Sequence, residues 1–341
     1  MAAPQGYPLL ALENPLLDIQ ARGDAALLEK YGLKPNDAIL AEKQHMGIYE
    51  DLLARDAKLI PGGAAQNTAR GAQYMLPDNS VVYIGCIGKD KYGDILKKTC
   101  EEAGVHTEYR VDENTPTGKC GVVITGHDRS MCTDLAAAND PPHVWSLVEK
   151  AQFYYVGGYH LTVCVPAIEA LGEEAAAKNK VFMLSLSAPF IPQFFKEQLD
   201  TVLPYTDYTF CNETEARAYA ASHEWGTEDV VEIAKKLALL PKKNTQRPRV
   251  AIVTQGTEPT VVGIASNGSV EVKQFNVHEI SKDAINDTNG AGDAFAGGFC
   301  AGVVSGKSLE DSIDMGQWLA SKSIQELGPS FPSPKQTYSR S

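Results

Sequence analysis

Short runs of apolar and β-branched residues alternate along most of the chain with longer stretches whose apolar residues recur at helical spacing. The runs that predict core strands are residues 81–84, 153–156, 181–186, 208–210 and 250–253, and residues 270–280 are strand-like. The stretches that predict helices are residues 95–103, 168–178, 229–240, 294–304 and 309–325. Such alternation is typical of βαβ units, in which helices cover a parallel sheet on both faces. We therefore predict an α/β fold with a doubly wound, mostly parallel sheet.

Two segments do not follow this alternation. Asp18–Ala41 and Thr117–Thr133 carry short patterns of alternating polarity, such as Lys119–Ile124, which are typical of half-buried strands. We interpret them as strands of a small second sheet inserted into the main domain. The predicted large domain comprises residues 1–17, 62–116 and 140–341, and the small domain comprises residues 18–61 and 117–139. Residues 329–341 are predicted to form a loose tail.

Composition excludes several classes of partner. The 341 residues carry a net charge of −12, whereas a protein that binds nucleic acid or an anionic membrane needs a basic face. The seven cysteines are scattered without a Cys-x-x-Cys pair, as expected for reduced thiols in the cytosol. No apolar run approaches the about 20 residues that span a bilayer. We expect a cytoplasmic protein without a nucleic-acid or membrane partner, and the sequence leaves a nuclear location open.

The run Asp287–Phe295 is the strongest chemical signal. Gly290 and Gly292 bracket Ala291 where a predicted strand gives way to an apolar helix. Small residues at a helix N-terminus let backbone N–H groups converge on an anion, and the helix dipole favours negative charge there. Asp293, in the first turn, can reach the same point as a general base. The pattern suits transfer of a phosphoryl group to a hydroxyl, although a Gly-rich loop that ends in an N-capping Asp has the same spacing.

Two other motifs in this region are incomplete. Gly290–Gly292 begins a dinucleotide-binding fingerprint, but Phe295 occupies the position of its third glycine. Gly302–Ser308 resembles a P-loop, yet only three residues separate its glycines and it ends a helix instead of opening one. We interpret Gly306 as a helix stop and Lys307 as a surface charge.

The run Asp287–Phe295 resembles the signature of the PfkB/ribokinase family of sugar and nucleoside kinases. Five further segments resemble that family in the same order along the chain: residues 14–18, 62–67, 136–139, 186–190 and 212–215. Among the members of the family, they most resemble the branch that phosphorylates adenosine. The resemblance implies a ribokinase-like fold in which the small inserted α/β domain is a lid over the substrate. Closure of a lid excludes water, which competes with the substrate hydroxyl.

The resemblance also implies the reaction. ATP, with Mg²⁺, would donate its γ-phosphate to the ribose 5′-hydroxyl of adenosine, giving AMP and ADP in purine salvage. The alternatives are another sugar or nucleoside kinase of the family, such as a ribokinase or an inosine/guanosine kinase, and a non-catalytic nucleoside-binding protein. The expected partners are adenosine and ATP, and we expect a monomer.

Roles in the phosphoryl transfer follow from the same resemblance. Asp293 would be the general base, acting near its ordinary pKa of about 3.9 because a loose transition state needs little prior deprotonation. The backbone at Gly290, Ala291 and Gly292 would form the anion hole, and Arg129 would fold over the phosphates. The residues expected to contact the nucleotide are Asn212, Thr254, Gly256 and Asn289.

Asn212 and Glu215 have two compatible interpretations. Asn followed three residues later by Glu is a capping-box variant at a helix start. By resemblance, the pair organises Mg²⁺ through water, which suits an ion that keeps several of its waters.

The remaining expected site residues surround the nucleoside. The sugar would contact Asn14, Asp18, Gly62, Gly63 and Asn67, with the Asp18 carboxylate accepting hydrogen bonds from the 2′,3′-diol. The purine would lie among Leu16, Cys120, Met131, Leu135 and Phe190, with Phe190 as the stacking partner. The chain departs from the family at four places: Glu13 where glycine is common, Ala64 in place of a hydroxyl residue, His160 in place of an aromatic hydrocarbon, and a short segment between Asn139 and Trp145.

Overall fold

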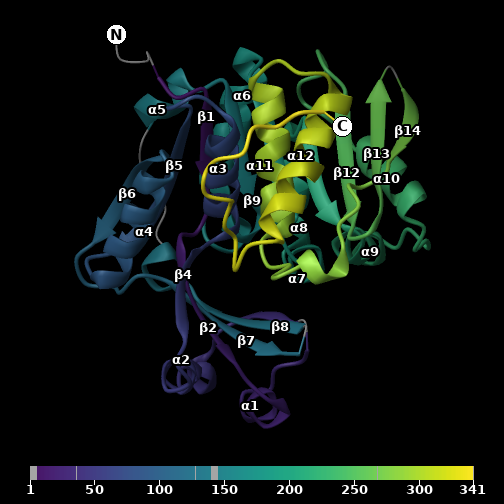
Figure 1. Cartoon of the computed structure of the whole chain (residues 1–341). Helices are drawn as coiled ribbons and strands as arrows, with labels where there is room; N and C mark the ends of the chain where they lie inside the picture. Colours follow the sequence, from purple (N-terminus) through teal and green to yellow (C-terminus); the bar gives the residue numbers. More distant parts are fainter. Residues whose placement is uncertain (1–5, 36, 127, 140–144, 267, 341) are drawn as a thin grey trace.

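The chain, seen here as a computed structural model, is organised around a nine-stranded sheet (Figure 1). The structure describes every residue except 1–5, 36, 127, 140–144, 267 and 341. The strand order is β14-β13-β12-β11-β10-β9-β1-β5-β6, and all neighbours are parallel except at β12–β13 and β13–β14. The strands are β1 (Leu9–Leu12), β5 (Val81–Gly88), β6 (His106–Asp112), β9 (Phe153–Gly157), β10 (Val181–Ser185), β11 (Tyr208–Asn212), β12 (Arg249–Gln255), β13 (Glu258–Ser266) and β14 (Ser269–Phe275). The predicted mostly parallel sheet is confirmed.

Helices cover both faces of this sheet. On one face lie α3 (Ala64–Met75), α4 (Lys91–Glu102), α11 (Ala291–Val304) and α12 (Leu309–Ser323). On the other lie α5 (Trp145–Lys150), α6 (Val165–Lys178), α7 (Phe190–Phe194), α8 (Lys196–Val202), α9 (Glu213–Ser222) and α10 (Val230–Ala238). Each layer packs its own apolar core against the sheet. The strands are therefore buried on both sides, which explains why they are nearly continuous apolar runs.

A second, five-stranded sheet lies below the first (Figure 1), in the order β3-β8-β7-β2-β4. Its strands are β2 (Leu16–Arg22), β3 (Ala38–Leu40), β4 (Lys58–Gly62), β7 (Lys119–Thr125) and β8 (Asp128–Asp134). The helices α1 (Ala25–Lys30) and α2 (Ile48–Leu53) cover it. The alternating pattern over Asp18–Ala41 predicted strands only, which is wrong for α1, because the Asp24 side chain caps a helix there by accepting from the N–H of Leu27 at 2.8 Å.

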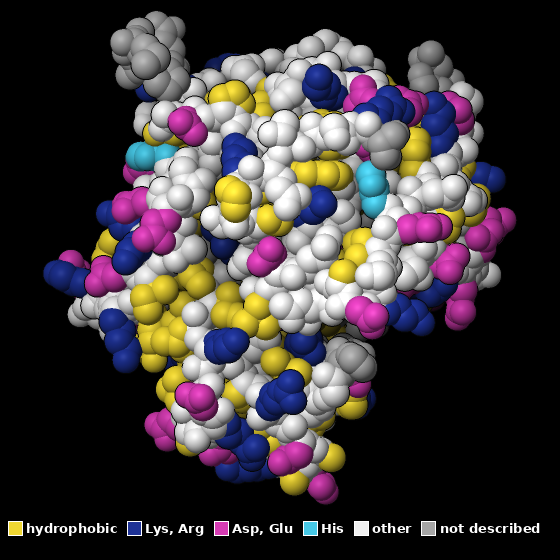
Figure 2. Space-filling model, viewed as in Figure 1, with side chains coloured by type: hydrophobic (Ala, Val, Ile, Leu, Met, Phe, Trp, Pro, Cys, Tyr) yellow, Lys and Arg dark blue, Asp and Glu magenta, His cyan; other side chains and the backbone are white. Residues whose placement is uncertain are grey.

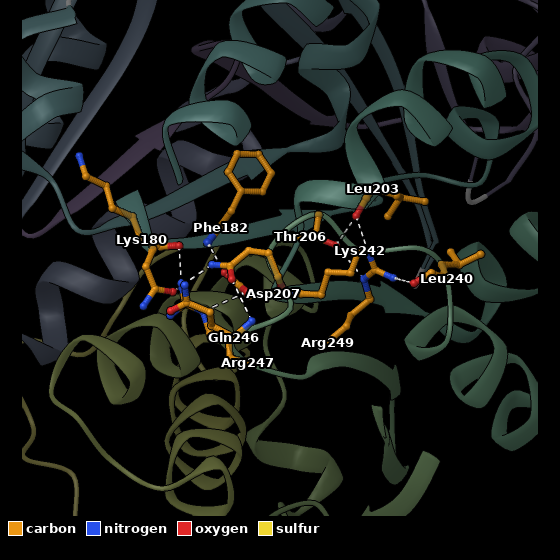
Figure 3. Close-up of polar contacts among 12 residues, drawn as sticks. Lys180, Phe182, Leu203, Thr206, Asp207, Leu240, Lys242, Gln246, Arg247 and Arg249 are labelled. Carbon is orange, nitrogen blue, oxygen red and sulfur yellow. Dashed lines mark hydrogen bonds and ion pairs between the residues drawn. The ribbon is translucent and has the colours of Figure 1, made fainter. Parts of the chain in front are cut away.

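Buried polar groups gather at the amino ends of β10, β11 and β12 (Figure 3). The Asp207 carboxylate lies 2.6 Å from Lys242 Nζ and 3.0 Å from Arg247 Nε, and it accepts the backbone N–H of Phe182 at 2.9 Å. Nearby, the buried Arg249 donates to three backbone oxygens and one hydroxyl: those of Leu203, Leu240 and Pro241, and Thr206 Oγ1. These ion pairs and hydrogen bonds hold the amino ends of the three strands together.

The C-terminal segment is not a loose tail, contrary to the sequence prediction. Tyr74 on α3 donates to the Pro332 carbonyl at 3.1 Å and packs its ring 5.2 Å from that of Phe331. Tyr338 packs edge-on against Trp318 of α12, with centroids 5.7 Å apart. The many Pro and Ser residues of the C-terminal segment prevent regular secondary structure, but its aromatic residues still anchor it over α3 and α12.

The surface is mixed in charge. Figure 2 shows acidic and basic side chains interspersed over one face, while apolar side chains group where the small sheet joins the large one. The exposed large apolar side chains of the small-sheet region are Met46, Leu53 and Leu59. Within the described residues, no helix is long and apolar enough to cross a membrane.

Candidate active site

A cavity of about 490 Å³ lies between the carboxyl ends of the parallel strands and the inner face of the small sheet. Crevices at this edge are the usual binding site of open α/β folds. Of the residues predicted from sequence, the cavity is lined by Asn14, Leu16, Asp18, Gly63, Asn67, Cys120, Arg129, Met131, Leu135, Phe190, Asn212, Glu215, Thr254, Asn289, Gly290, Ala291, Gly292 and Asp293. Gly62 and Gly256 are not among the lining residues.

The catalytic turn opens α11. Gly290 is the N-cap and takes a left-handed φ of +79°, and a Cβ there would come within 2.6 Å of Pro329, so glycine is required. Gly292 has a different role, because a Cβ added to it would meet nothing within 4 Å. The backbone therefore lies open to the cavity above Gly292, where the first turn leaves N–H groups without helical partners.

Asp293 does not cap this helix. It is the third residue of α11, and Gly290 at the cap position has no side chain to accept a bond. The Asp293 carboxylate accepts a hydrogen bond from Asn67 Nδ2 at 2.9 Å. The capping alternative left open by the sequence is therefore wrong for this residue, and its carboxylate faces the cavity.

The pKa of Asp293 is not the ordinary value assumed from sequence. Burial of the carboxyl raises its pKa to about 7, although the hydrogen bond from Asn67 and the charge of Arg70 act to lower it. Spacing along a sequence does not disclose this desolvation, which arises when α3 and α11 enclose the group. A carboxylate with such a pKa is a stronger base at neutral pH than one at about 3.9.

Asp18 lies on β2 across the cavity. The residue is 8% exposed, and burial, with Asp293 as a lesser cause, raises the pKa of its carboxyl to about 7. Within the described part of the chain, no group donates a hydrogen bond to this carboxylate. Gly62 on β4 allows it to fit, because a Cβ at Gly62 would lie 2.4 Å from Asp18 Oδ1. A nearly buried acceptor without a donor is expected to bind donors of a ligand.

The apolar wall includes the five residues predicted to surround the purine and three that sequence reasoning missed. Ile39 and Leu40 enter from β3, and Tyr159 enters beside Phe190, with ring centroids 5.9 Å apart. Nothing in the short run of β3 distinguished it from an ordinary small strand. Tyr159 precedes His160, so the departure from the family pattern at His160 was the sequence feature that could have pointed to this part of the wall.

Asn212 and Glu215 form a complete capping box at the start of α9. Asn212 Oδ1 accepts the Glu215 N–H at 2.8 Å, and Glu215 Oε2 accepts the Asn212 N–H at 3.0 Å. Burial raises the pKa of Glu215 to about 7. Among the residues that the structure describes, no group of three or more His, Cys, Asp or Glu side chains gathers to hold a metal directly. The pair therefore offers oxygen atoms to a hydrated ion more readily than to a bare one.

Arg129 reaches the cavity from β8. Its Nη2 lies 3.3 Å from Oδ1 of the buried Asp287, which also accepts the Asn289 N–H at 2.9 Å and receives Gln20 Nε2 from β2 at 3.4 Å. Asp287 thus connects two strands of the small sheet to the loop before the catalytic turn. Sequence reasoning passed over it as part of the motif.

Comparison with known proteins defines the family. Residues 25–336 match the model of the pfkB family carbohydrate kinases. The chain is 48% identical to adenosine kinase of Saccharomyces cerevisiae over 98% of its length and 99% of that protein's, and 45% identical to adenosine kinase of Schizosaccharomyces pombe over 97% and 98%. Among solved structures, it resembles Anopheles gambiae adenosine kinase in complex with P1,P4-di(adenosine-5) tetraphosphate, with a TM-score of 0.92 and 41% identity over 97% of this chain and 100% of that one.

The chain belongs to the pfkB family of carbohydrate kinases. The ribokinase-like fold expected from the resemblance is thereby confirmed, and the enzyme class is a phosphotransferase with an alcohol acceptor. Kinases of this kind take ATP as co-substrate.

Two departures from the family pattern lie at or next to the residues that line the cavity. His160 is buried and its Nδ1 donates to Asn14 Oδ1 at 2.9 Å, and burial lowers the pKa of His160 to about 4, so the ring is neutral. Glu13 accepts the N–H of Ala65 at 2.7 Å, in the first turn of α3. The third departure, Ala64, lines the cavity. The short segment between Asn139 and Trp145 lies outside the described residues.

Glu13 makes the stability of this family member depend on pH. Burial raises the pKa of Glu13 to about 8 from an ordinary value of 4.5, so the folded state binds a proton that the unfolded chain releases. This contribution to stability is present below pH 4.5 and is lost as pH rises through 8. Glu13→Gln mimics the protonated acid, so its Tm should exceed that of the wild type by an increasing margin between pH 5 and pH 9.

Differential scanning calorimetry of both proteins checks this expectation. Glu228→Gln, at an exposed carboxylate, is the matched control and should show no such divergence. A Tm difference for Glu13→Gln that stays constant or shrinks with rising pH would show that Glu13 is ionised in the folded protein.

Proposed function

We propose that this protein phosphorylates the ribose 5′-hydroxyl of adenosine with ATP, giving AMP and ADP, and so serves purine salvage. The observation that carries the proposal is the arrangement of the cavity. Asp293 and the open backbone at Gly292 line the same cavity as an apolar wall and Asp18, whose carboxylate receives no hydrogen bond from the residues that the structure describes. A nucleoside presents the matching features, a hydroxyl to be phosphorylated, a vicinal diol and an apolar ring. The names of the most similar relatives support adenosine as that nucleoside.

Asp293 would orient the 5′-hydroxyl and accept its proton. As the hydroxyl oxygen forms a bond to the γ-phosphorus of ATP, the bond from that phosphorus to the β,γ-bridging oxygen breaks and ADP leaves. With a pKa of about 7, Asp293 is ionised in a substantial fraction of molecules at neutral pH. The N–H groups at the start of α11 would face the charge on the transferring phosphoryl group, and Arg129 would complete its screening.

Mg²⁺ fits the residues present only through water. Glu215 and Asn212 line the cavity together with Thr254 and Asn289, but each of the three side-chain oxygens of the pair already accepts a hydrogen bond within it. When bound, the ion would neutralise charge on the phosphates of ATP. We propose these four residues as the contacts of the nucleotide and its ion, with Gly256 on the exposed turn after β12.

The small sheet would act as the lid of this site. It contributes Asp18, Leu40, Cys120 and Met131 to the cavity wall, so its closure would bury the nucleoside and exclude water. We propose residues 18–61 and 117–139 as this lid domain and the remaining residues as the large domain. We also propose that the chain acts as a cytoplasmic monomer.

A competition assay tests the proposed function. Wild-type protein with ATP and Mg²⁺ should phosphorylate adenosine with a higher kcat/KM than inosine or free ribose, because a sugar alone leaves the apolar wall unfilled. Omission of Mg²⁺ should abolish turnover. Preference for ribose or inosine would assign the chain to another member of the family, and tight adenosine binding without product would identify a non-catalytic nucleoside-binding protein.

A further inference from the structure

Arg70 is a buried cation beside the proposed catalytic base, and nothing in the reaction described so far uses it. It lies on α3, and the residue is only 7% exposed. Its terminal nitrogen Nη2 lies 2.7 Å from Asn67 Oδ1, 3.1 Å from the Pro61 carbonyl and 3.0 Å from the Pro329 carbonyl. Within the described residues, Arg70 Nε is buried without a partner. A single nitrogen therefore makes all three contacts.

The contact with Asn67 sets the orientation of an amide. Asn67 lies one turn before Arg70 on the same helix, and its Oδ1 accepts from Arg70. This leaves Asn67 Nδ2 on the opposite side, where it donates to Asp293 Oδ2 at 2.9 Å. An amide carries a donor at one end and an acceptor at the other, so a cation at one end dictates that the donor faces the carboxylate. Arg70, Asn67 and Asp293 thus form a directed chain of hydrogen bonds from α3 to α11.

The charge of Arg70 acts on the same carboxylates. Of the titratable groups around it, Asp293 on α11 and Asp18 on β2 have their pKa lowered by Arg70, against the larger effect of burial. The other groups that interact with Arg70 are Tyr109 on β6 and Cys100 on α4. The groups that interact with Asp293 besides Asn67 and Arg70 are Glu13, Asp18, Tyr155, Tyr159 and Glu215. Arg70 is therefore a cation placed among carboxyl and phenol groups.

We infer that Arg70 is a positioning residue for the phosphoryl transfer, which orients the Asn67 amide toward Asp293 and favours the ionised form of the Asp293 carboxylate. The inference rests on the proposed function for its readout. It assigns to Arg70 a contact with Asn67 and not with the substrate. The backbone contacts at Pro61 and Pro329 fix the guanidinium relative to β4 and to the C-terminal segment, so the chain of hydrogen bonds has a rigid origin.

The test is the pH dependence of kcat/KM for adenosine in Arg70→Met, Arg70→Gln and Arg70→Lys. Loss of the charge raises the pKa of Asp293 and of Asp18. The ascending limb of the pH profile of kcat/KM should therefore move to higher pH by about one unit in Arg70→Met and Arg70→Gln. For both variants, the ratio of wild-type to variant kcat/KM should then be about tenfold larger at pH 6 than on the plateau. Their plateau kcat should be lower by about 10–100-fold, because the base is misoriented.

Arg70→Lys is the conservative rescue. An ammonium keeps the charge and has three donors, one for each acceptor that Nη2 serves, so its limb should coincide with that of the wild type. Lys307→Met, at an exposed cation beyond the far end of α11, removes the same charge and should leave the profile unchanged. If Arg70→Met fails to fold in a thermal melt, Arg70→Gln and Arg70→Lys carry the comparison.

The outcomes separate this inference from the proposed function. If Arg70→Met and Arg70→Gln lose the same fraction of kcat/KM at every pH and the ascending limb does not move, Arg70 is a structural residue and the inference is overturned. A wild type that binds adenosine without transferring phosphate would overturn the proposed function, and with it the role of Arg70 in the transfer, and this result is seen in the wild type alone. In that case the pH dependence of the adenosine Kd shows whether the charge of Arg70 acts on the site, because Arg70 also lowers the pKa of Asp18, and the same displacement in Arg70→Met and Arg70→Gln is required.

Discussion

Asp293→Asn is expected to lower kcat by about 10²–10⁴, the contribution of a positioned general base, while adenosine still binds. The amide keeps the shape of the carboxylate but cannot accept the proton of the 5′-hydroxyl. The substitution also removes the negative charge of the carboxylate to which Asn67 Nδ2 donates at 2.9 Å, and it opens no cavity in the core. The measurement is single-turnover phosphorylation of adenosine at saturating ATP, together with the adenosine Kd from calorimetry.

Asp283→Asn, at an exposed carboxylate of the loop that leads to the catalytic turn, is the matched control and should behave as the wild type. A loss in kcat of less than about tenfold for Asp293→Asn would be too small for a general base. Asp293 would then serve only to hold α3 against α11 through Asn67.

The second large effect concerns the sugar. 2′-Deoxyadenosine should be a markedly poorer substrate than adenosine, chiefly in kcat/KM. Asp18 is 8% exposed, and no group in the described residues donates to its carboxylate, so the ribose diol would supply the missing donors. Sites built to hydrogen-bond a hydroxyl can reject the analogue that lacks it by as much as about 10⁴-fold, because a buried polar group is left unpaired.

A double cycle isolates this contribution of Asp18. Asp18→Ala should lower activity on adenosine and narrow the ratio of kcat/KM between the two substrates, since the group that senses the missing hydroxyl is gone. Asn14→Ala is the comparison variant, at another lining residue, whose Oδ1 and Nδ2 contact His160 and Tyr159. It should change the ratio of kcat/KM between the two substrates less than Asp18→Ala does. A ratio of ratios near one would show that Asp18 does not bind the diol.

The sequence predicted most of the architecture, because each central strand is a short apolar run buried on both faces. Thus 81–84, 153–156 and 250–253 all fall within observed strands, and Gly306 does follow the end of α11. What failed was governed by side-chain interactions that periodicity does not register. Asp24 caps a helix within an apparently strand-like segment, and aromatic residues anchor a C-terminal segment of coil-like composition.

The site was predictable where chemistry is concentrated in one short motif. The turn at residues 290–293 and the carboxylate of Asp18 converge on one cavity as the resemblance implied. Interactions that depend on three-dimensional enclosure were not predictable. Three of them depend on the folded structure. Burial raises the pKa of Asp293, Asp287 connects segments that are far apart in the sequence, and Arg70 and Asn67 are buried together only on folding. A lone arginine on a helix is otherwise expected at the surface.

The central claim is transfer of the γ-phosphate of ATP to the 5′-oxygen of adenosine, and phosphorus-31 NMR of the reaction mixture tests it most directly. Wild-type protein with ATP, Mg²⁺ and adenosine should convert the γ-phosphorus signal into a phosphomonoester signal split by the two 5′ protons of AMP, while an equal amount of ADP appears. Asp293→Asn should give the same signal far more slowly. ADP together with free inorganic phosphate and no phosphomonoester, or a phosphomonoester on another hydroxyl, would contradict the account.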